Sequence, residues 1–544
     1  IKGFAAGCDL SMPGGSAYME EACVEAVRSG RLFEACVDAS VERMLKLEKQ
    51  CGIKIEDTPQ ADLPAGYALA KKIAAEGAVL LKNEDALLPL FNEEETAFIG
   101  YMAKEMRYQG SGSSRINPWK QKNMIQVCRN ARFAMGCNAD GSTSDALLTE
   151  VRRAATEAKY AVVFAGLPDS CESEGFDREH MRMPKGHIRM IEEAAKANEN
   201  CIVVLLCGSV VELPWFERVK AVLYMGLSGE AGAEAAADLL FGRENPCGKL
   251  AETWPLTYGD CVSAPYYSGT RKDAQYREGL YAGYRYYETA GRPVRFPFGY
   301  GLSYTDFSYS DLKIEGTAVS CTVTNTGSRF GKEIVQLYIK PQAAGVYRPV
   351  RELKGFSKIA LAPGESGEVH FLLDERSFAV WMDGWKVQDG SYQICIGKDC
   401  HTIVLSQETY VQGEQIAGQN VPAWYHAPAG SPSKEDFETL LGHAIVEKSL
   451  KKGEFTMDNT VCEMKAYSLI MKIMYKAIEK TVAKGFGKKA DYTDPTFRMI
   501  MSSSADCSLT SMKISGGMNN HLLEGLLEMA NGRFFKGVRL LLKK

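Results

Sequence analysis

The sequence has few histidines, and none of them are spaced as metal ligands. Its 544 residues include 7 histidines, which show neither the H-x-H nor the H-E-x-x-H spacing that places two imidazoles on one ion. The 16 cysteines stand as singletons without a C-x-x-C pair, which excludes the common zinc and dithiol motifs. We therefore expect no metal and no cofactor, and we interpret the cysteines as reduced core thiols of a cytoplasmic protein.

A long apolar run and a large net charge are also missing. The longest apolar stretch, from Cys201 to Val211, is interrupted by Gly208 and Ser209 and is shorter than the roughly 18 residues of a membrane-spanning helix. Lys plus Arg total 64 against 68 Asp plus Glu, a formal charge of −4, which gives no field to attract nucleic acid. We expect neither a membrane span nor nucleic-acid binding. The length predicts about three or four domains.

The first fifty residues combine a turn rich in glycine and proline, GCDLSMPGG, with two predicted helices. Apolar residues recur there at the three- and four-residue steps of a helix face. Two helices cannot bury such faces alone, so without a further partner they would expose a sizeable apolar surface. The apolar positions are Val24, Val27, Leu32, Cys36, Val37, Val41, Met44 and Leu45.

From about 66 to 265, apolar strands alternate with amphipathic helices. A helix at 66–77 is followed in order by the strands GAVLLK, TAFIGY, AVVFAG, CIVVLLC and KAVLYMG. Near-continuous apolar strands separated by helices predict a parallel sheet that is covered on both faces. Ligand sites of such sheets lie on the loops beyond the carboxyl ends of the strands.

The period changes to two between about 308 and 408, which predicts a β-sandwich. Before it, the aromatic segments YREGLYAGYRYY and FPFGYGLSYTDF favour a domain interface over sugar stacking. After it, the chain becomes helical and carries the basic segments KGFGKK and GRFFKGVRLLLKK. The leucines at 522, 523, 526 and 527 favour docking on protein over a membrane surface.

Five acidic residues crowd the loop that follows AVVFAG: Asp169, Glu172, Glu174, Asp177 and Glu179. Glycoside hydrolysis uses two carboxyl groups, one of which donates a proton to the leaving oxygen. A glutamate beside a glycine, at the carboxyl end of a strand, suits that role. The residues alone leave open that this is only a solvated acidic turn.

The segment RYQGSGSSRINP begins at Arg107 and includes Gln109. It lacks both the Lys-Ser/Thr ending of a P-loop and the G-x-G-x-x-G spacing of a dinucleotide site, which disfavours a nucleotide-dependent enzyme. A flexible loop and a loop that hydrogen-bonds sugar hydroxyls remain open.

Five segments resemble, in order, the C-terminal half of glycoside hydrolase family 3, the β-glucosidase and β-xylosidase family. They are ESEGFDRE, GSVVELPWF, LLFGRENPCGKLAETWP, GYRYYETAGRPVRFPFGYGLSYTDFSYS and VTNTGSRFGKEIVQLYIKP. The resemblance implies an α/β plus β fold: a parallel-sheet α/β sandwich, a fibronectin III-like β-sandwich, a (β/α) barrel remnant at the N-terminus and a helical C-terminal tail. The implied domains are 1–50 (barrel remnant), 51–65 (linker), 66–265 (α/β sandwich), 266–307 (aromatic connection), 308–408 (fibronectin III-like) and 409–544 (helical extension).

By this resemblance Glu174, the glutamate before glycine in SEGFDR, is the general acid/base, with Glu172 as the fallback. Arg107 and Gln109 lie in the loop that approaches the substrate. The family's nucleophile is an aspartate in an S-D-W-like barrel motif, and the sequence contains no such motif. GFAAGCDLSMPGG resembles the barrel segment just after it, so we expect the chain to begin downstream of the nucleophile and do not assign that role to Asp9.

The resemblance implies a retaining, exo-acting β-glycosidase of the β-glucosidase type that removes terminal non-reducing β-D-glucosyl residues from oligosaccharides or glycosides. Because it lacks the nucleophile segment, this chain is expected to be inactive alone. Two alternatives stay open: β-xylosidase specificity, and a non-catalytic carbohydrate-binding or scaffolding fragment. Homo-oligomerisation is also left open.

Overall fold

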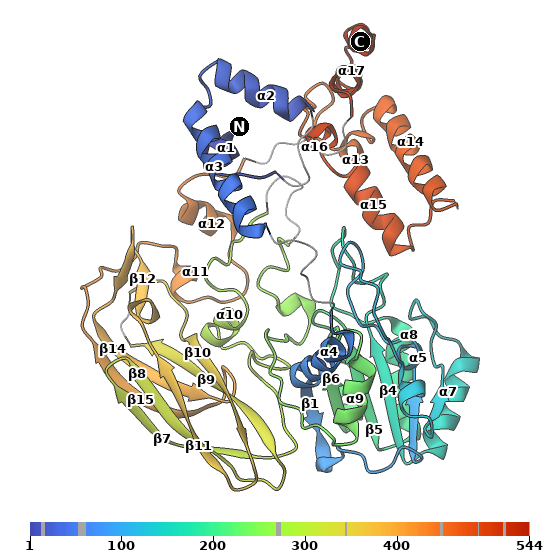
Figure 1. Ribbon diagram of the computed structural model, residues 1–544, viewed down its shortest axis with the longest axis vertical. Coiled ribbons are helices and arrows are strands. Elements are labelled where there is room, and N and C mark those ends of the chain that lie inside the picture. The colour runs from blue at the N-terminus through green and yellow to red at the C-terminus, as the bar shows by residue number, and fades with distance from the viewer. Residues whose placement is uncertain are drawn as a thin grey trace. The chain divides into compact units, whose positions relative to one another are not determined.

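The computed structural model describes residues 1–544 except 12–16, 53–60, 268–273, 343–344, 447–449, 488, 515–517 and 543–544 (Figure 1). The chain divides into two compact units. Unit 1 comprises 1–62, 173–176 and 448–544, and unit 2 comprises 63–172 and 177–447. The MPGG part of the first predicted turn, most of the expected linker at 51–65, Lys488 of KGFGKK and the last two residues of GRFFKGVRLLLKK lie outside the described residues.

A six-stranded sheet forms the first part of unit 2. Its strands lie in the order β1-β6-β5-β4-β2-β3, and all neighbours are parallel except β1 and β6. The prediction of a wholly parallel sheet is therefore wrong at one edge. An edge strand far in sequence from its partner needs no crossover helix, so it can pair in either direction. The bounds are β1 (Val79–Asn83), β2 (Thr96–Ile99), β3 (Arg132–Ala134), β4 (Tyr160–Gly166), β5 (Cys201–Leu206) and β6 (Ala221–Tyr224).

Helices cover both faces of this sheet, as predicted (Figure 1). Side chains alternate between the faces along each strand: Val163 packs with α7 and α8, whereas Val162 and Phe164 pack with the helices of the other face. Each face therefore has its own apolar core. The bounds are α4 (Leu63–Gly77), α5 (Tyr101–Lys104), α6 (Met124–Val127), α7 (Asp145–Glu157), α8 (Lys185–Ala197) and α9 (Gly232–Leu240).

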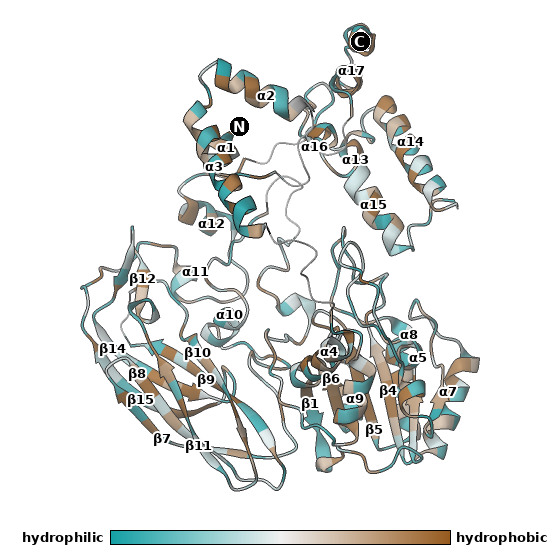
Figure 2. Ribbon diagram, in the orientation of Figure 1, coloured by the Kyte–Doolittle hydropathy of each residue, from teal (hydrophilic) through white to brown (hydrophobic). Residues whose placement is uncertain are grey.

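Two antiparallel sheets, β10-β9-β14-β15 and β11-β8-β7, form the β-sandwich of unit 2. The alternating residues of the sequence lie in the shared core, where Val323, Leu337 and Ile394 are fully buried, and Figure 2 shows apolar stretches along these strands. The predicted sandwich is present. The bounds are β7 (Phe307–Glu315), β8 (Ala318–Asn325), β9 (Gly331–Pro341), β10 (Glu352–Leu361), β11 (Ser366–Leu372), β14 (Gly390–Gly397) and β15 (Ile403–Val411), with a hairpin of β12 (Ala379–Trp381) and β13 (Trp385–Val387).

Aromatic side chains join the parts of unit 2, as the interface interpretation expected. The ring of Tyr284, on α10 (Tyr284–Thr289), stacks on Phe298 with centroids 4.8 Å apart, and its hydroxyl accepts from the Leu353 N–H at 2.9 Å. The Tyr281 hydroxyl donates to the carbonyl of Tyr425 at 2.7 Å. Tyr281 and Tyr284 are buried and Phe298 is partly buried, so these rings pack against protein. Short elements complete the unit: η2 (Glu84–Ala86), η3 (Phe216–Arg218), η4 (Tyr258–Asp260), η5 (Glu375–Ser377), α11 (Ala423–His426) and α12 (Lys434–Leu441).

Unit 1 contains the N-terminal and C-terminal helices. In the N-terminal part, α1 (Lys2–Ala5), α2 (Ala17–Arg28) and α3 (Glu34–Cys51) leave Val24, Val41 and Leu45 between 48% and 59% exposed, which is the apolar surface expected from the sequence. In the C-terminal part, Leu523 is buried in a small core with Phe455 and Met471. Its helices are α13 (Val461–Met464), α14 (Leu469–Gly485), α15 (Pro495–Ala505), α16 (Leu509–Ile514), α17 (Asn520–Ala530) and α18 (Phe534–Leu541). Among all described helices, none combines the length and hydropathy of a membrane crossing.

Candidate active site

The loops after β2, β4 and β5 meet at one edge of the sheet, because these neighbouring strands are parallel. The acidic loop leaves the sheet at Gly166, the last residue of β4. A Cβ there would lie 1.9 Å from the carbonyl oxygen of Leu206 on β5, so only glycine fits. The Nδ1 atom of His187 on α8 lies 3.0 Å from the Gly166 carbonyl. The start of the loop is therefore tightly held.

Arg107 ties the loop after β2 to the loop after β4. Its Nε donates to Asp169 at 3.1 Å, and its Nη1 donates to the Leu167 carbonyl at 2.8 Å and to the Glu172 carboxylate at 2.5 Å. Its Nη2 donates to the Glu172 carbonyl at 2.9 Å. With only 6% of its side chain exposed, Arg107 uses its donors on the protein itself.

Glu172, the predicted fallback acid, is an ionised anchor in this network. Besides Arg107, its carboxylate accepts from the Gly208 N–H at 2.9 Å and from the Ser209 hydroxyl, both after β5. Burial raises the pKa of this carboxyl, but the hydrogen bonds from Ser209 and Gly208 and the charge of Arg107 outweigh it, so the pKa lies below its usual range. A carboxylate held in this state is poorly suited to donate a proton.

Arg178 holds the C-terminal half of the acidic loop against the loop that follows β5. Its Nη1 donates at 2.8 Å to both the Ser209 hydroxyl oxygen and the Val210 carbonyl. The loop is therefore held on both sides of its tip, at Glu172 before it and at Arg178 after it.

The tip of the loop, 173–176, packs within unit 1 and carries Glu174. Glu174 is exposed. Gly175 has a φ of +87°, and a Cβ there would lie 2.9 Å from the Cα of Met499 on α15. The guanidinium of Arg498 lies 3.5 Å from the centroid of the Phe176 ring. The helical extension thus contacts the residues on the C-terminal side of Glu174.

Gln109 is held by its own loop rather than by the Arg107 network. Its Oε1 accepts from the Ile116 N–H at 2.9 Å, and its Nε2 donates to the Tyr108 hydroxyl at 3.1 Å. The structure therefore brings Arg107 and Glu172 together, whereas Gln109 stabilises the adjoining segment.

Sequence reasoning missed Glu252, which lines a cavity of about 710 Å³ beside the ends of β5 and β6 with Gly208, Leu227 and Ser228. The residue is exposed to solvent, but neighbouring protein atoms partly desolvate its carboxyl, and this, with repulsion from Glu172, raises its pKa. The segment LAETWP was used only for its resemblance, and no local pattern marks this glutamate.

The described residues contain no group of three His, Cys, Asp or Glu side chains that could hold a metal ion. The 16 cysteines all fall within the described part and are free thiols. The chemistry that these loops offer is that of carboxyl groups: an ionised Glu172, a Glu252 whose charge is disfavoured, and an exposed Glu174. Proton transfer is therefore the reaction type that suits them.

Comparison with family models gives two matches. Residues 78–304 match the glycosyl hydrolase family 3 C-terminal domain, and residues 333–400 match the fibronectin type III-like domain. The first match contains all the loops described above, and the second lies within the β-sandwich.

Two relatives similar to this chain are glycosidases. The chain is 43% identical over 430 residues to thermostable beta-glucosidase B of Acetivibrio thermocellus, covering 76% of this chain and 57% of the relative. It is 38% identical over 433 residues to an exo-alpha-(1->6)-L-arabinopyranosidase of Bifidobacterium breve, covering 75% and 57%. The chain thus spans less than two thirds of these relatives.

Solved structures show the same similarity. The family 3 beta-glucosidase of Bifidobacterium adolescentis matches with a TM-score of 0.72 and 34% identity, covering 80% of this chain and 66% of the other. Beta-glucosidase 3B from Thermotoga neapolitana, solved with alpha-D-glucose, matches with a TM-score of 0.68 and 30% identity, covering 76% and 65%.

Proposed function

This chain belongs to glycoside hydrolase family 3. We propose that it is part of a retaining, exo-acting β-glycosidase that releases terminal β-D-glucosyl residues. In this proposal Glu174 protonates the glycosidic oxygen and then activates the water that hydrolyses the glycosyl-enzyme intermediate. The supporting observation is the network around Glu172. Because that carboxylate is bound by Arg107, Ser209 and Gly208, it acts as an anchor, which favours its exposed neighbour Glu174 as the proton donor.

Arg107 and Gln109 have indirect roles in this proposal. Arg107 holds the acidic loop by donating to Glu172 and Asp169, and Gln109 shapes the segment beside it. Both would affect substrate binding by positioning loops.

We further propose that 1–50 is the last part of a (β/α) barrel that carries the nucleophile. The exposed Val24, Val41 and Leu45 support this, because such a surface is usually covered by further protein. Asp9 is paired with Arg43 at 2.6 Å, and this contact lowers the pKa of Asp9. Its pairing fits a structural role. The same proposal includes the remaining domain boundaries, which are 51–65, 66–265, 266–307, 308–408 and 409–544. It also includes a cytoplasmic location, which the free cysteines support.

The test of the acid/base is a Glu174→Gln variant of the full-length protein, assayed on aryl β-glucosides with good and poor leaving groups. A poor leaving group needs protonation, so kcat/KM for the substrate that carries it should fall by about 10²- to 10⁴-fold. For dinitrophenyl glucoside, whose leaving group needs no protonation, kcat/KM reports the first step and should fall much less. Glu179→Gln, an exposed acid of the same loop, is the matched control. If Glu174→Gln kept the wild-type kcat/KM on both substrates, Glu174 would not be the acid/base.

A second specificity has its own support, because two relatives are exo-alpha-(1->6)-L-arabinopyranosidases. The kcat/KM values of the full-length protein on nitrophenyl β-D-glucoside, β-D-xyloside and α-L-arabinopyranoside would rank the three sugars. Absence of turnover on all of them would favour a carbohydrate-binding or scaffolding role, which calorimetry with glucose and cellobiose would then test.

A further inference from the structure

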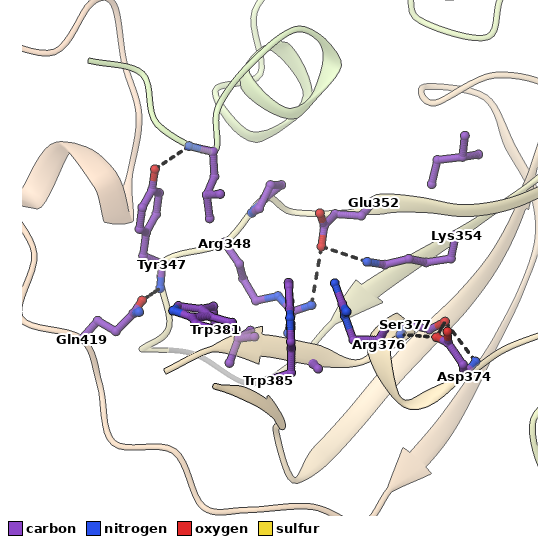
Figure 3. A pocket seen from close by; sticks show the side chains of 15 residues that line it. Tyr347, Arg348, Glu352, Lys354, Asp374, Arg376, Ser377, Trp381, Trp385 and Gln419 are labelled. Carbon is purple, nitrogen blue, oxygen red and sulfur yellow. Dashed lines mark hydrogen bonds and ion pairs between the residues drawn. The ribbon is translucent and has the colours of Figure 1, made fainter. Parts of the chain in front are cut away.

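A second cavity, of about 590 Å³, lies in the β-sandwich and has no part in the proposed hydrolysis. It lies between the loop leading into β10 and the elements η5, β12 and β13, and Leu280 and Gln419 also line it. Figure 3 shows Arg348 reaching into this cavity, with Glu352 and Lys354 on one side and Trp381, Trp385 and Arg376 on the other.

Arg348 is buried with donors that it does not use. Its side chain is 6% exposed, and its Nε and Nη1 atoms have no hydrogen-bond partner among the described residues. Its Nη2 is 3.8 Å from the Glu352 carboxylate, beyond hydrogen-bonding distance. Buried charged donors without acceptors are costly, so an anion that enters the cavity beside this guanidinium would be stabilised by its charge.

Two tryptophans form the opposite wall. Trp381 and Trp385 are cross-strand partners in the β12–β13 hairpin, with ring centroids 5.5 Å apart at 77°. They are nevertheless 61% and 50% exposed. The guanidinium of Arg376 lies 3.7 Å from the centroid of the Trp385 ring, which leaves Trp381 as the more open ring. Exposed tryptophans beside polar donors suit a ligand with a flat apolar face and a polar edge.

The charges of the lining favour an anion. Arg348, Lys354 and Arg376 face two acids, Glu352 and Asp374. The Asp374 carboxylate accepts from the backbone N–H and hydroxyl of Ser377, both at 2.9 Å, and is therefore occupied by its own turn. Glu352 is shared between Arg348 at 3.8 Å, Lys354 at 3.4 Å and, from outside the lining, Arg285 at 3.5 Å. One positive charge is left in excess.

We propose that this cavity binds a saccharide that carries a carboxylate, with a uronic acid residue on Arg348 and a sugar ring stacked on Trp381. The carboxylate would pair with the charges of Arg348 and Lys354, which line the cavity, and the apolar face of the ring would cover the indole. The choice of a saccharide over another flat anion rests on the proposed function, whereas the anion site rests only on the cavity.

The experiment is titration of the whole chain, by calorimetry and tryptophan fluorescence, with an aldobiouronic acid and with neutral xylobiose. The acidic disaccharide should bind in the range of about 0.1 to 10 mM, with an affinity that falls as salt is added, and xylobiose should bind at least about tenfold more weakly. Trp381→Ala, an exposed position, and Arg348→Gln should each weaken binding of the acid by about tenfold or more. Phe356→Ala, at a 70% exposed aromatic on β10 that does not line the cavity, should bind as the wild type does.

Equal binding of the two disaccharides, or unchanged binding in Trp381→Ala with a native circular dichroism spectrum, would overturn the proposal. Binding of benzoate without binding of the acidic sugar would overturn the choice of a saccharide. Because binding is measured without turnover, these results are independent of the Glu174→Gln assay, so failure of one proposal is distinguishable from failure of the other.

Discussion

The Nη1 atom of Arg107 lies 2.5 Å from the Oε2 atom of Glu172, although 65 residues separate them along the chain. Arg107 follows β2 and Glu172 follows β4, and these strands are neighbours in the sheet. The pair therefore fixes the base of the acidic loop just before Glu174. The groups that hold Glu172 and Arg107 come from three loops of unit 2, so the base of the acidic loop depends on the sheet as a whole.

Removing the charge of Glu172 should destabilise the α/β part of the protein. Glu172→Gln leaves the buried Arg107 without a full counter-charge, and we expect the free energy of unfolding to fall by about 2 to 4 kcal/mol. Urea unfolding followed by tryptophan fluorescence measures this, because Trp215 and Trp254 are fully buried in that core. Glu179→Gln should stay within about 0.5 kcal/mol of wild type; an equal loss in both variants would contradict the role of the pair.

Acid should weaken the fold through His187. Burial lowers the pKa of this imidazole to about 4 from its ordinary value of 6.5. The native state therefore stays neutral while the unfolded state takes up a proton, so stability is full above pH 6.5 and falls between pH 6.5 and 4, by about 3 kcal/mol in all. In His187→Gln this part of the stability-against-pH curve should flatten, while an unchanged slope would contradict the assignment.

Glu76 joins the α/β part of unit 2 to its β-sandwich. This residue of α4 lies 2.6 Å from both Lys332 on β9 and Lys358 on β10, and the hydrogen bonds from the two ammonium groups lower the pKa of its carboxyl to about 2. Its contribution is therefore present above pH 4.5 and lost as the pH falls through 2.

Glu76→Gln should lower the free energy of unfolding at pH 7 by about 1 to 2 kcal/mol, because the three side chains are partly exposed and solvent screens the pairs. The unfolding midpoints of the two parts should also separate in differential scanning calorimetry. Glu95→Gln, whose partner Lys159 is exposed, is the control. Equal effects of the two variants would argue against the bridge.

Gly175 should be intolerant of a side chain. Gly175→Ala combines a φ of +87° with a Cβ 2.9 Å from the backbone of Met499, so the loop tip must move. On the proposed mechanism, kcat of the full-length enzyme on a poor leaving group should fall by about tenfold or more, since small displacements of an acid are costly. Gly364→Ala has a similar φ of +75° with no atom within 4 Å and should leave kcat unchanged. Normal turnover by Gly175→Ala would show that the tip need not hold this conformation.

Periodicity along the chain was enough to predict the layers of the fold. Strands buried on both faces, such as β4 and β5, are continuous apolar runs, and sandwich strands such as β8 alternate. The antiparallel direction of β1 was missed, because strand direction at an edge leaves no mark on hydrophobicity. The acidic loop was identified from its composition. The different states of Glu172 and Glu252 were not, because each depends on groups distant in sequence.

Local pattern therefore identified five of the six strands of the α/β sheet and the glutamate that the family resemblance singles out, since each is encoded in a few neighbouring residues, but it missed the short β3 and the helix α7. The tertiary structure determined which carboxylate is anchored and which groups accept the hydrogen bonds of Arg107. It also determined that Arg348 is buried in the cavity that Trp381 and Trp385 line. The physical reason is that pKa, burial and hydrogen bonding depend on the distance between atoms in space. That distance is set by the packing of strands and loops and not by separation along the chain.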